Sequence, residues 1–179
     1  MIAQVAAQPA MELDARLFYR VYTIDTPGFA RAMHAIDKSA IPVFGVGIAS
    51  AGIGLIRDDN ASSAFYRLAA SELLAAGIGF AVKSFVRRPR PYATYSSITP
   101  RAHVYWWDKF AFPSVHTAVA FAAVTSWTLS HPSFLMAAGG YLWATGVGLS
   151  RVWLGVHYPT DVLVGALLGT VVAVGLSAF

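Results

Sequence analysis

Two apolar runs without a single charged residue constrain this chain more than any other feature. They cover residues 134–149 and 162–179, and further largely apolar runs cover residues 41–56, 68–86 and 114–129. About 20 apolar residues in a helix cross the ~30 Å hydrocarbon core of a bilayer. Inside that core every backbone polar group must be satisfied, which helices achieve and irregular chain does not. We therefore expect an all-α, polytopic transmembrane helix bundle of about five spans.

The composition supports a membrane protein. Of the 179 residues, 56% are hydrophobic and only 12% are charged, and the mean hydropathy is +0.55. Soluble domains carry roughly 25% charged residues, about twice this fraction. The chain has no cysteine, which excludes disulfides, thiolate metal sites and cysteine nucleophiles.

Residues 1–40 have a different pattern, in which apolar side chains are interleaved with arginines. We expect an amphipathic segment at the membrane interface, made of two short helices broken at residues 26–28. The remainder, residues 41–179, forms the transmembrane domain. Between its first two spans, Asp58 and Asp59 have no third ligand beside them, so a solvated turn is expected there rather than a metal site.

The two charge-free runs enclose a polar stretch that contains Arg151, His157 and Asp161. Pro159 suits the first turn of a helix, which places Asp161 in that turn and His157 just outside it. The carboxylate can then accept a hydrogen bond from one imidazole nitrogen and leave the other free to attack. The alternative is that His157 and Asp161 only cap a helix, since an aspartate in a first turn is common.

Two further polar stretches carry candidate binding groups. The first contains Lys83 and Arg90 in a basic run at the end of the second span, where a membrane anchor is the alternative. The second begins the third span, with Ser114 as the N-cap and His116 in the first turn. Free N–H groups at such a helix end form an anion site, which His116 can reach.

Counting crossings places all three polar stretches on one face of the membrane. Fixed cations, helix N–H donors, two histidines and a carboxylate around one point describe a pocket for a multiply charged oxyanion. A histidine backed by Asp161, together with a second histidine, is the minimum set for nucleophilic attack and protonation of a leaving group.

These stretches resemble the three-part signature of the type 2 phosphatidic acid phosphatase superfamily. Lys83 and Arg90-Pro91 match the first part in type and spacing, and Ser150-Arg151, His157 and Asp161 match the third. In the second part, Pro113-Ser114-Val115-His116, Val115 stands where the family usually has glycine. That departure matters only if the glycine allows a backbone conformation closed to valine.

The resemblance implies the role of each matched residue. His157 would attack phosphorus and form a phosphohistidine, Asp161 would orient it, and His116 would protonate the leaving oxygen. The phosphoryl oxygens would be held by the fixed cations and by the start of the third span, namely Lys83, Arg90, Ser114, Val115 and Arg151. The implied enzyme is a lipid phosphatase that acts on a lipid phosphate or diphosphate, with no metal, no other cofactor and no nucleic acid partner.

Two alternatives to a hydrolase stay open at this point. A phosphotransferase would have the same site but pass the phosphoryl group to a lipid or sugar. A non-enzymatic binder of anionic headgroups would need the cations but not His157 with Asp161. The nine acidic residues form no ligand cluster on the face of the site, so we expect no dependence on a metal.

The resemblance to bacterial relatives places the protein in the inner membrane with its site on the periplasmic face. The distribution of charge gives the opposite orientation. Eleven of the thirteen Lys and Arg lie on the site's face or in the N-terminal segment, against Arg57 and Arg67 on the other face. The positive-inside rule would put the site in the cytoplasm. We follow the resemblance and expect a periplasmic site.

Overall fold

The computed structural model describes residues 9–54 and 62–178, and their regular structure is helical apart from one isolated bridge between Pro89 and Phe110. The all-α expectation is therefore confirmed. The helices in chain order are α1 (Pro9–Tyr22), α2 (Pro27–Gly54), α3 (Ser62–Val86), α4 (Pro91–Thr94), α5 (Val115–Ser130), α6 (Phe134–Trp153) and α7 (Pro159–Ser177).

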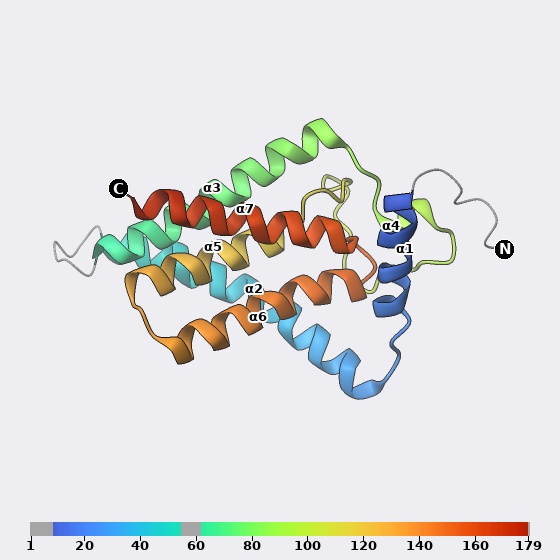
Figure 1. The fold of residues 1–179 in the computed structure, drawn as a ribbon, viewed down its shortest axis with the longest axis horizontal. Coiled ribbons are helices and arrows are strands. Elements are labelled where there is room, and N and C mark those ends of the chain that lie inside the picture. The colour runs from blue at the N-terminus through green and yellow to red at the C-terminus, as the bar shows by residue number, and fades with distance from the viewer. Residues whose placement is uncertain (1–8, 55–61, 179) are drawn as a thin grey trace.

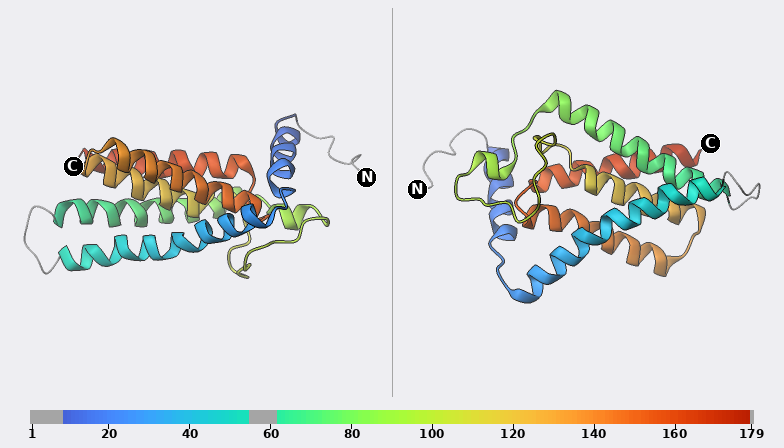
Figure 2. Two further views of the ribbon diagram at one scale, coloured as in Figure 1. Left: turned by 90° about the horizontal axis from the view of Figure 1, so that it is seen from below. Right: turned by 180° about the vertical axis from the view of Figure 1, so that it is seen from behind.

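Five long helices form a bundle, and α1 lies across one end of it (Figures 1 and 2). Helix α5 is central, because it packs against α2, α3, α6 and α7. The same end of the bundle that α1 covers also holds α4 and the long connection from α4 to α5 (Figure 2). This end is where the polar stretches of the sequence come together.

Small residues allow α5 and α7 to touch backbone to backbone. A Cβ atom at Gly169 would overlap the carbonyl group of Ala118, and one at Gly165 would lie 2.5 Å from the carbonyl oxygen of Ser114. Such contacts are typical of helix pairs in membranes, where small residues permit close approach. The Gly165 and Gly169 pattern expected to mediate packing therefore lies in the α5–α7 interface.

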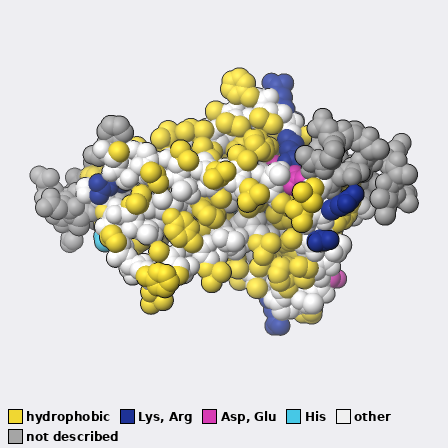
Figure 3. All heavy atoms as spheres, viewed as in Figure 1, with side chains coloured by type: hydrophobic (Ala, Val, Ile, Leu, Met, Phe, Trp, Pro, Cys, Tyr) yellow, Lys and Arg dark blue, Asp and Glu magenta, His cyan; other side chains and the backbone are white. Residues whose placement is uncertain are grey.

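The outer surface of the bundle is apolar. Leu163, Leu167 and Val171 of α7 are 63%, 63% and 66% exposed, and Phe134 and Leu135 of α6 are 89% and 80% exposed. Figure 3 shows hydrophobic side chains over the flank of the bundle and several Lys and Arg side chains near the α1 end. By length and hydropathy, two described helices can cross a bilayer, Ser63–Val86 and Pro159–Ser177.

The N-terminal third differs from the expected layout. The chain breaks between α1 and α2, close to the expected break, but α2 then continues without interruption through Pro42 to Gly54. Residues 27–40 thus belong to the same helix as the first expected span. Proline removes one helical hydrogen bond and usually ends or kinks a helix, but the 16-residue first span was short enough to extend back past Pro42, as α2 does. The turn expected at Asp58 and Asp59 lies outside the described residues.

Candidate active site

The structure brings all the expected site residues to one end of the bundle. Lys83 lies in the last turn of α3, Arg90 precedes α4, Ser114 precedes α5, and His116 is in the first turn of α5. Arg151 lies in the last turn of α6, His157 in the connection to α7, and Asp161 in the first turn of α7. All are buried except His116, which is partly exposed.

Local backbone geometry directs the basic stretch into the site. Helix α3 ends at Val86, and Arg87 takes a left-handed conformation with φ of 51°. A non-glycine residue there turns the chain sharply, and Pro91 then starts α4. Arg90 lies between these two constraints and is only 3% exposed. A basic run that merely anchored the protein would stay at the lipid interface.

His157 and Asp161 are neighbours but are not hydrogen-bonded. Nδ1 of His157 lies 3.6 Å from Oδ2 of Asp161, which is too far for a hydrogen bond, and it has no hydrogen-bond partner among the described residues. Oδ2 of Asp161 instead accepts the backbone N–H of Tyr158 at 2.8 Å, and Oδ1 accepts Nη1 of Arg88 at 2.7 Å. Asp161 therefore caps α7, as the plainer alternative had it, while its carboxylate remains the nearest acidic group to His157.

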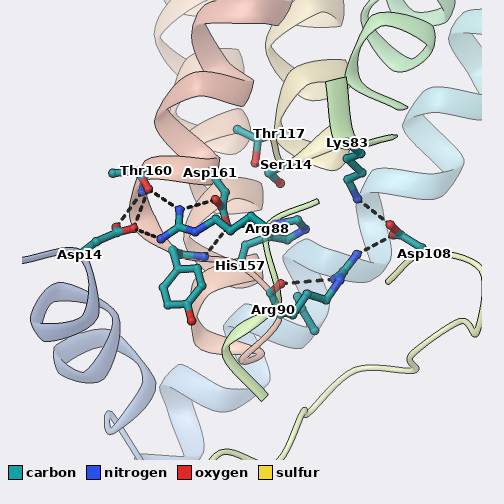
Figure 4. Close-up of polar contacts among 12 residues, drawn as sticks. Asp14, Lys83, Arg88, Arg90, Asp108, Ser114, Thr117, His157, Thr160 and Asp161 are labelled. Atoms are coloured by element: carbon teal, nitrogen blue, oxygen red, sulfur yellow. Dashed lines mark hydrogen bonds and ion pairs between the residues drawn. The ribbon is translucent and has the colours of Figure 1, made fainter. Parts of the chain in front are cut away.

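The cations expected to hold phosphate each hold an aspartate. Asp108 bonds Lys83 through one carboxylate oxygen and Arg90 through the other, both at 2.6 Å (Figure 4). Arg151 bonds Asp37 of α2 at 2.5 Å. Neither aspartate was predicted. A charged carboxylate and a phosphoryl group use the same N–H donors, so a phosphoryl oxygen bound here would have to displace an aspartate.

A cavity of about 190 Å³ adjoins these groups. Its lining includes the two arginines, both aspartates and the general-acid candidate, namely Arg90, Arg151, Asp37, Asp108 and His116. The connection from α4 to α5 supplies much of the remaining wall. Of the residues expected to form an oxyanion pocket, Arg90, His116 and Arg151 line this cavity, together with two acidic groups, whereas Lys83 and His157 are not among its lining residues.

Burial and neighbouring charges set the ionisation states of His157 and Asp108, which both lie in connections between helices. Burial, reinforced by Arg90, Lys83 and Arg151, holds the pKa of His157 well below its usual value of 6.5. Its imidazole is therefore neutral at pH 7 and available as a nucleophile. Burial alone would raise the pKa of Asp108, but Lys83 and Arg90 outweigh burial and lower it, so this carboxylate is charged.

The start of α5 is tied to the start of α7. The backbone N–H of Ser114 donates to the carbonyl oxygen of Asp161 at 2.9 Å, and the Ser114 hydroxyl accepts that of Thr117 at 2.9 Å. Ser114 occupies the N-cap position, as expected, but its side chain does not bond the helix backbone. The N–H of Ser114 is thus occupied, and only later N–H groups of this helix end are left to bind an anion.

Val115 fits where the family usually has glycine. It is the first residue of α5 and has no left-handed φ, so the position needs no conformation closed to valine. Its side chain lies against α3, where Cγ2 would be 3.0 Å from a Cβ atom on Gly79. Gly79 of the facing helix leaves room for this side chain, so the departure from the motif is accommodated.

A second set of polar residues was missed altogether. Arg88, which the sequence placed only in a basic run, lies between Asp161 and Asp14 of α1 and bonds both. The basic run was a usable signal for Arg88, because its two prolines constrain the chain there. No local pattern marked Asp14, whose partners are 74 and 146 residues away in the sequence.

A helical bundle with an apolar exterior, buried cations and two histidines at one end has the features of a membrane enzyme that acts on phosphate esters. The sequence profile of the PAP2 superfamily matches residues 64–179, well over half of the chain. The chain therefore belongs to the PAP2 superfamily, and the expected assignment to this class of phosphatase is confirmed.

Individual proteins support the same fold. Over 66 residues the chain is 46% identical to the bacitracin transport permease protein BcrC of Bacillus licheniformis, which covers 35% of this chain and 30% of that protein. The crystal structure of LpxE from Aquifex aeolicus matches with a TM-score of 0.73, 24% identity and full coverage of both chains. A transmembrane PAP2 type phosphatidylglycerolphosphate phosphatase from Bacillus subtilis matches with a TM-score of 0.76, 21% identity and 98% and 88% coverage. The fold is thus that of transmembrane PAP2 phosphatases.

Proposed function

We propose that this protein is a metal-independent phosphatase that removes a phosphate from a membrane lipid phosphomonoester or diphosphate through a phosphohistidine. The observation that carries the proposal is the buried His157, which lies 3.6 Å from Asp161 and within electrostatic reach of the cations Lys83, Arg90 and Arg151. A binder of anionic headgroups needs the cations, but it does not need a neutral imidazole backed by a carboxylate.

In the first step, Nε2 of His157 attacks phosphorus while the bond from phosphorus to the leaving oxygen breaks. His116 donates a proton to that oxygen, and the lipid alcohol or lipid phosphate departs. The imidazole gains positive charge as it bonds phosphorus, which the carboxylate of Asp161 stabilises. Lys83, Arg90 and Arg151 neutralise the equatorial oxygens, which is the main contribution available to phosphoryl transfer.

In the second step, water replaces the lipid as the group in line with His157. His116, now neutral, accepts a proton from that water, the new oxygen bonds phosphorus, and the bond from phosphorus to nitrogen breaks. Inorganic phosphate leaves, His157 is regenerated as a neutral imidazole, and His116 is protonated for the next cycle. The three cations then return to Asp37 and Asp108, which offset two of their three charges in the empty pocket.

We also propose that α2, α3, α5, α6 and α7 all cross the bacterial inner membrane and that the site faces the periplasm. Their apolar outer faces and their common polar end support this arrangement. Helix α5 has 16 residues, or about 24 Å at ~1.5 Å per residue, so its ends need snorkelling neighbours. A reporter inserted at residues 95–105 tests the orientation, because reporters active only in the cytoplasm or only in the periplasm give opposite results.

The decisive experiment compares His157→Ala with His131→Ala in purified protein supplied with a panel of lipid phosphates and diphosphates. His131 is an exposed histidine in the turn between α5 and α6, at the other end of α5 from His116. Release of inorganic phosphate should fall about 10⁴-fold or more in His157→Ala and stay unchanged in His131→Ala. Absence of phosphate release by the wild type on the whole panel, or substantial turnover by His157→Ala, contradicts the proposal.

A further inference from the structure

Helix α1 reaches the candidate active site through one buried carboxylate. Asp14 is 4% exposed, and its Oδ1 accepts the backbone N–H of Thr160 at 3.0 Å, in the first turn of α7. Its Oδ2 accepts the hydroxyl of Thr160 at 2.6 Å and Nη2 of Arg88 at 2.6 Å. An aspartate that only docked an amphipathic helix would not need three donors, two of them from the helix that carries Asp161.

Arg88 carries this contact on to Asp161. Its Nη1 bonds Asp161 at 2.7 Å and Thr160 at 2.7 Å, while its Nη2 bonds Asp14 (Figure 4). The guanidinium group stacks on the ring of Tyr158, with Cζ 4.0 Å from the ring centre. A planar guanidinium held by a ring and two carboxylates has a fixed orientation, so it also fixes the carboxylate of Asp161.

The charges in this set alternate, and their sum decides what His157 experiences. Asp161 alone would supply one negative charge beside the imidazole, but Arg88 at 2.7 Å cancels it. Asp14 at 2.6 Å from Arg88 cancels Arg88 in turn. Asp14, Arg88 and Asp161 together therefore retain one net negative charge, which is needed when His157 becomes positive.

That retained charge matters because most other groups facing His157 are positive. Those from α3, the connection after it and α6 are the cations Lys83, Arg90 and Arg151. Asp108 and the second imidazole, His116, accompany them, and Asp37 pairs with Arg151. A neutral set of Asp161 and Arg88 would leave the positive imidazole without any offset on its own side.

We propose that Asp14 is a positioning residue of the active site, which acts through Arg88 to hold Asp161 and to keep the carboxylate side of His157 negative. Helix α1 is then part of the catalytic apparatus rather than only an interfacial anchor. This inference rests on the proposed phosphohistidine mechanism. It also makes a prediction that simple docking of α1 does not. Removing a negative charge and removing a positive charge should shift the pKa of His157 in opposite directions.

The experiment measures kcat/KM against pH, together with the rate at which phosphohistidine forms, in the full-length protein. Asp14→Asn removes a negative charge, so protonated His157 becomes less stable and the acid limb of the profile moves to lower pH. Arg88→Gln removes a positive charge, so the acid limb moves to higher pH. Each shift should be about half a unit to one unit, for a charge that acts through an intervening group.

Both substitutions should also slow phosphohistidine formation, by roughly 10- to 100-fold, which is typical of groups that orient a primary ligand or nucleophile. Asp14→Glu restores the charge and should return the acid limb to its wild-type position. Asp25→Asn is the matched control, because Asp25 is an exposed aspartate in the connection from α1 to α2. It should leave both quantities unchanged.

Opposite shifts in Asp14→Asn and Arg88→Gln support the inference, and shifts in the same direction or no shift overturn it. If Asp14→Asn does not fold, Asp14→Ser takes its place, because it also removes the negative charge while its hydroxyl can still accept a hydrogen bond, and the acid limb must again move to lower pH. A wild-type protein that forms no phosphohistidine would refute the proposed function itself. A wild type that forms it, beside an Asp14→Asn protein with the same profile and rate, refutes only the role of Asp14.

Discussion

The two halves of the site use the same kinds of residue but hold them differently. In the phosphate half, Lys83 and Arg90 pair with Asp108, and Arg151 pairs with Asp37. In the nucleophile half, Arg88 pairs with Asp161 and Asp14. The aspartate side chains of the phosphate half are 16% and 22% exposed, whereas those of the nucleophile half are 0% and 4% exposed.

Backbone contacts separate the two halves further. Asp161 and Asp14 each accept a backbone N–H at the start of α7, from Tyr158 and Thr160 respectively. No contact of this kind holds Asp37 or Asp108 among the hydrogen bonds of the described residues. A carboxylate bonded only to side chains can be exchanged for another anion, whereas one that also caps a helix cannot be moved without disturbing the helix. The comparison thus separates exchangeable from permanent carboxylates.

Of the changes that test this comparison, the largest effect should come from removing the charge of Asp161 in the nucleophile half. Asp161→Asn keeps the shape but removes the charge that stabilises the phosphohistidine, so turnover should fall about 10³- to 10⁴-fold. Asp37→Asn, the same change in the phosphate half, should alter turnover by about tenfold at most. Phosphate release from a lipid substrate measures both, and equal losses in the two variants would remove the distinction between the halves.

A smaller and substrate-dependent effect is expected at His116. A lipid alcohol is a poor leaving group and needs a proton, whereas p-nitrophenolate leaves without one. His116→Ala should therefore lose about 10²- to 10⁴-fold in turnover of a lipid monophosphate but much less in phosphohistidine formation from p-nitrophenyl phosphate. Rapid-quench measurement of the phosphoenzyme with both esters is the test. Equal losses would mean that His116 shapes the pocket and is not the acid.

Anions should bind the phosphate half more tightly when the competing carboxylate of Asp108 is removed. Asp108→Asn leaves Lys83 and Arg90 without a charged partner, so orthovanadate and phosphate should inhibit about tenfold more strongly. Because the cations hold the pKa of Asp108 below its usual value of 3.8, the competing carboxylate stays charged from about pH 5 to pH 8. The ratio of inhibition constants, wild type to variant, should thus be constant over that range. Weaker inhibition in Asp108→Asn would show that Asp108 organises the cations instead.

The smallest effect should come from chelation. Lys83, Arg90 and Arg151 already supply the positive charge that phosphoryl transfer needs, so EDTA should change activity by less than about twofold. The assay is phosphate release before and after dialysis against the chelator. Activity that disappeared with EDTA and returned with magnesium would place a metal in the phosphate half and contradict the exchange of aspartate for phosphate.

The site could be located from the sequence because its position depends on only a few local properties of the chain. The length and hydropathy of the runs were enough to assign Lys83, Arg90, His116, Arg151 and His157 to one end of the bundle. Proline and aspartate at the start of α7 were enough to predict its first turn. These inferences require only local chain geometry and the alternation of the membrane crossings.

Partners of the charged residues could not be predicted in this way. Arg151 and Asp37 are 114 residues apart, and Lys83 and Asp108 are 25 residues apart across a segment whose only helix is the four-residue α4. Whether such residues meet depends on the rotation of each helix about its axis and on the path of the loop. Asp37 was hidden further because α2 runs on through Pro42, which places it in a long helix rather than an interfacial segment.

The contact between α5 and α7 fixes more than packing. His116 lies in the first turn of α5 and His157 lies just before α7, and the two helices touch at Gly165 and Gly169 with no room for a methyl group. The spacing between these two histidines therefore depends on how the two helix backbones pack, together with the short connection that carries His157. A Gly169→Ala substitution would therefore change the distance between His116 and His157 and so affect activity, although it lies deep within the bundle and leaves every polar residue in place.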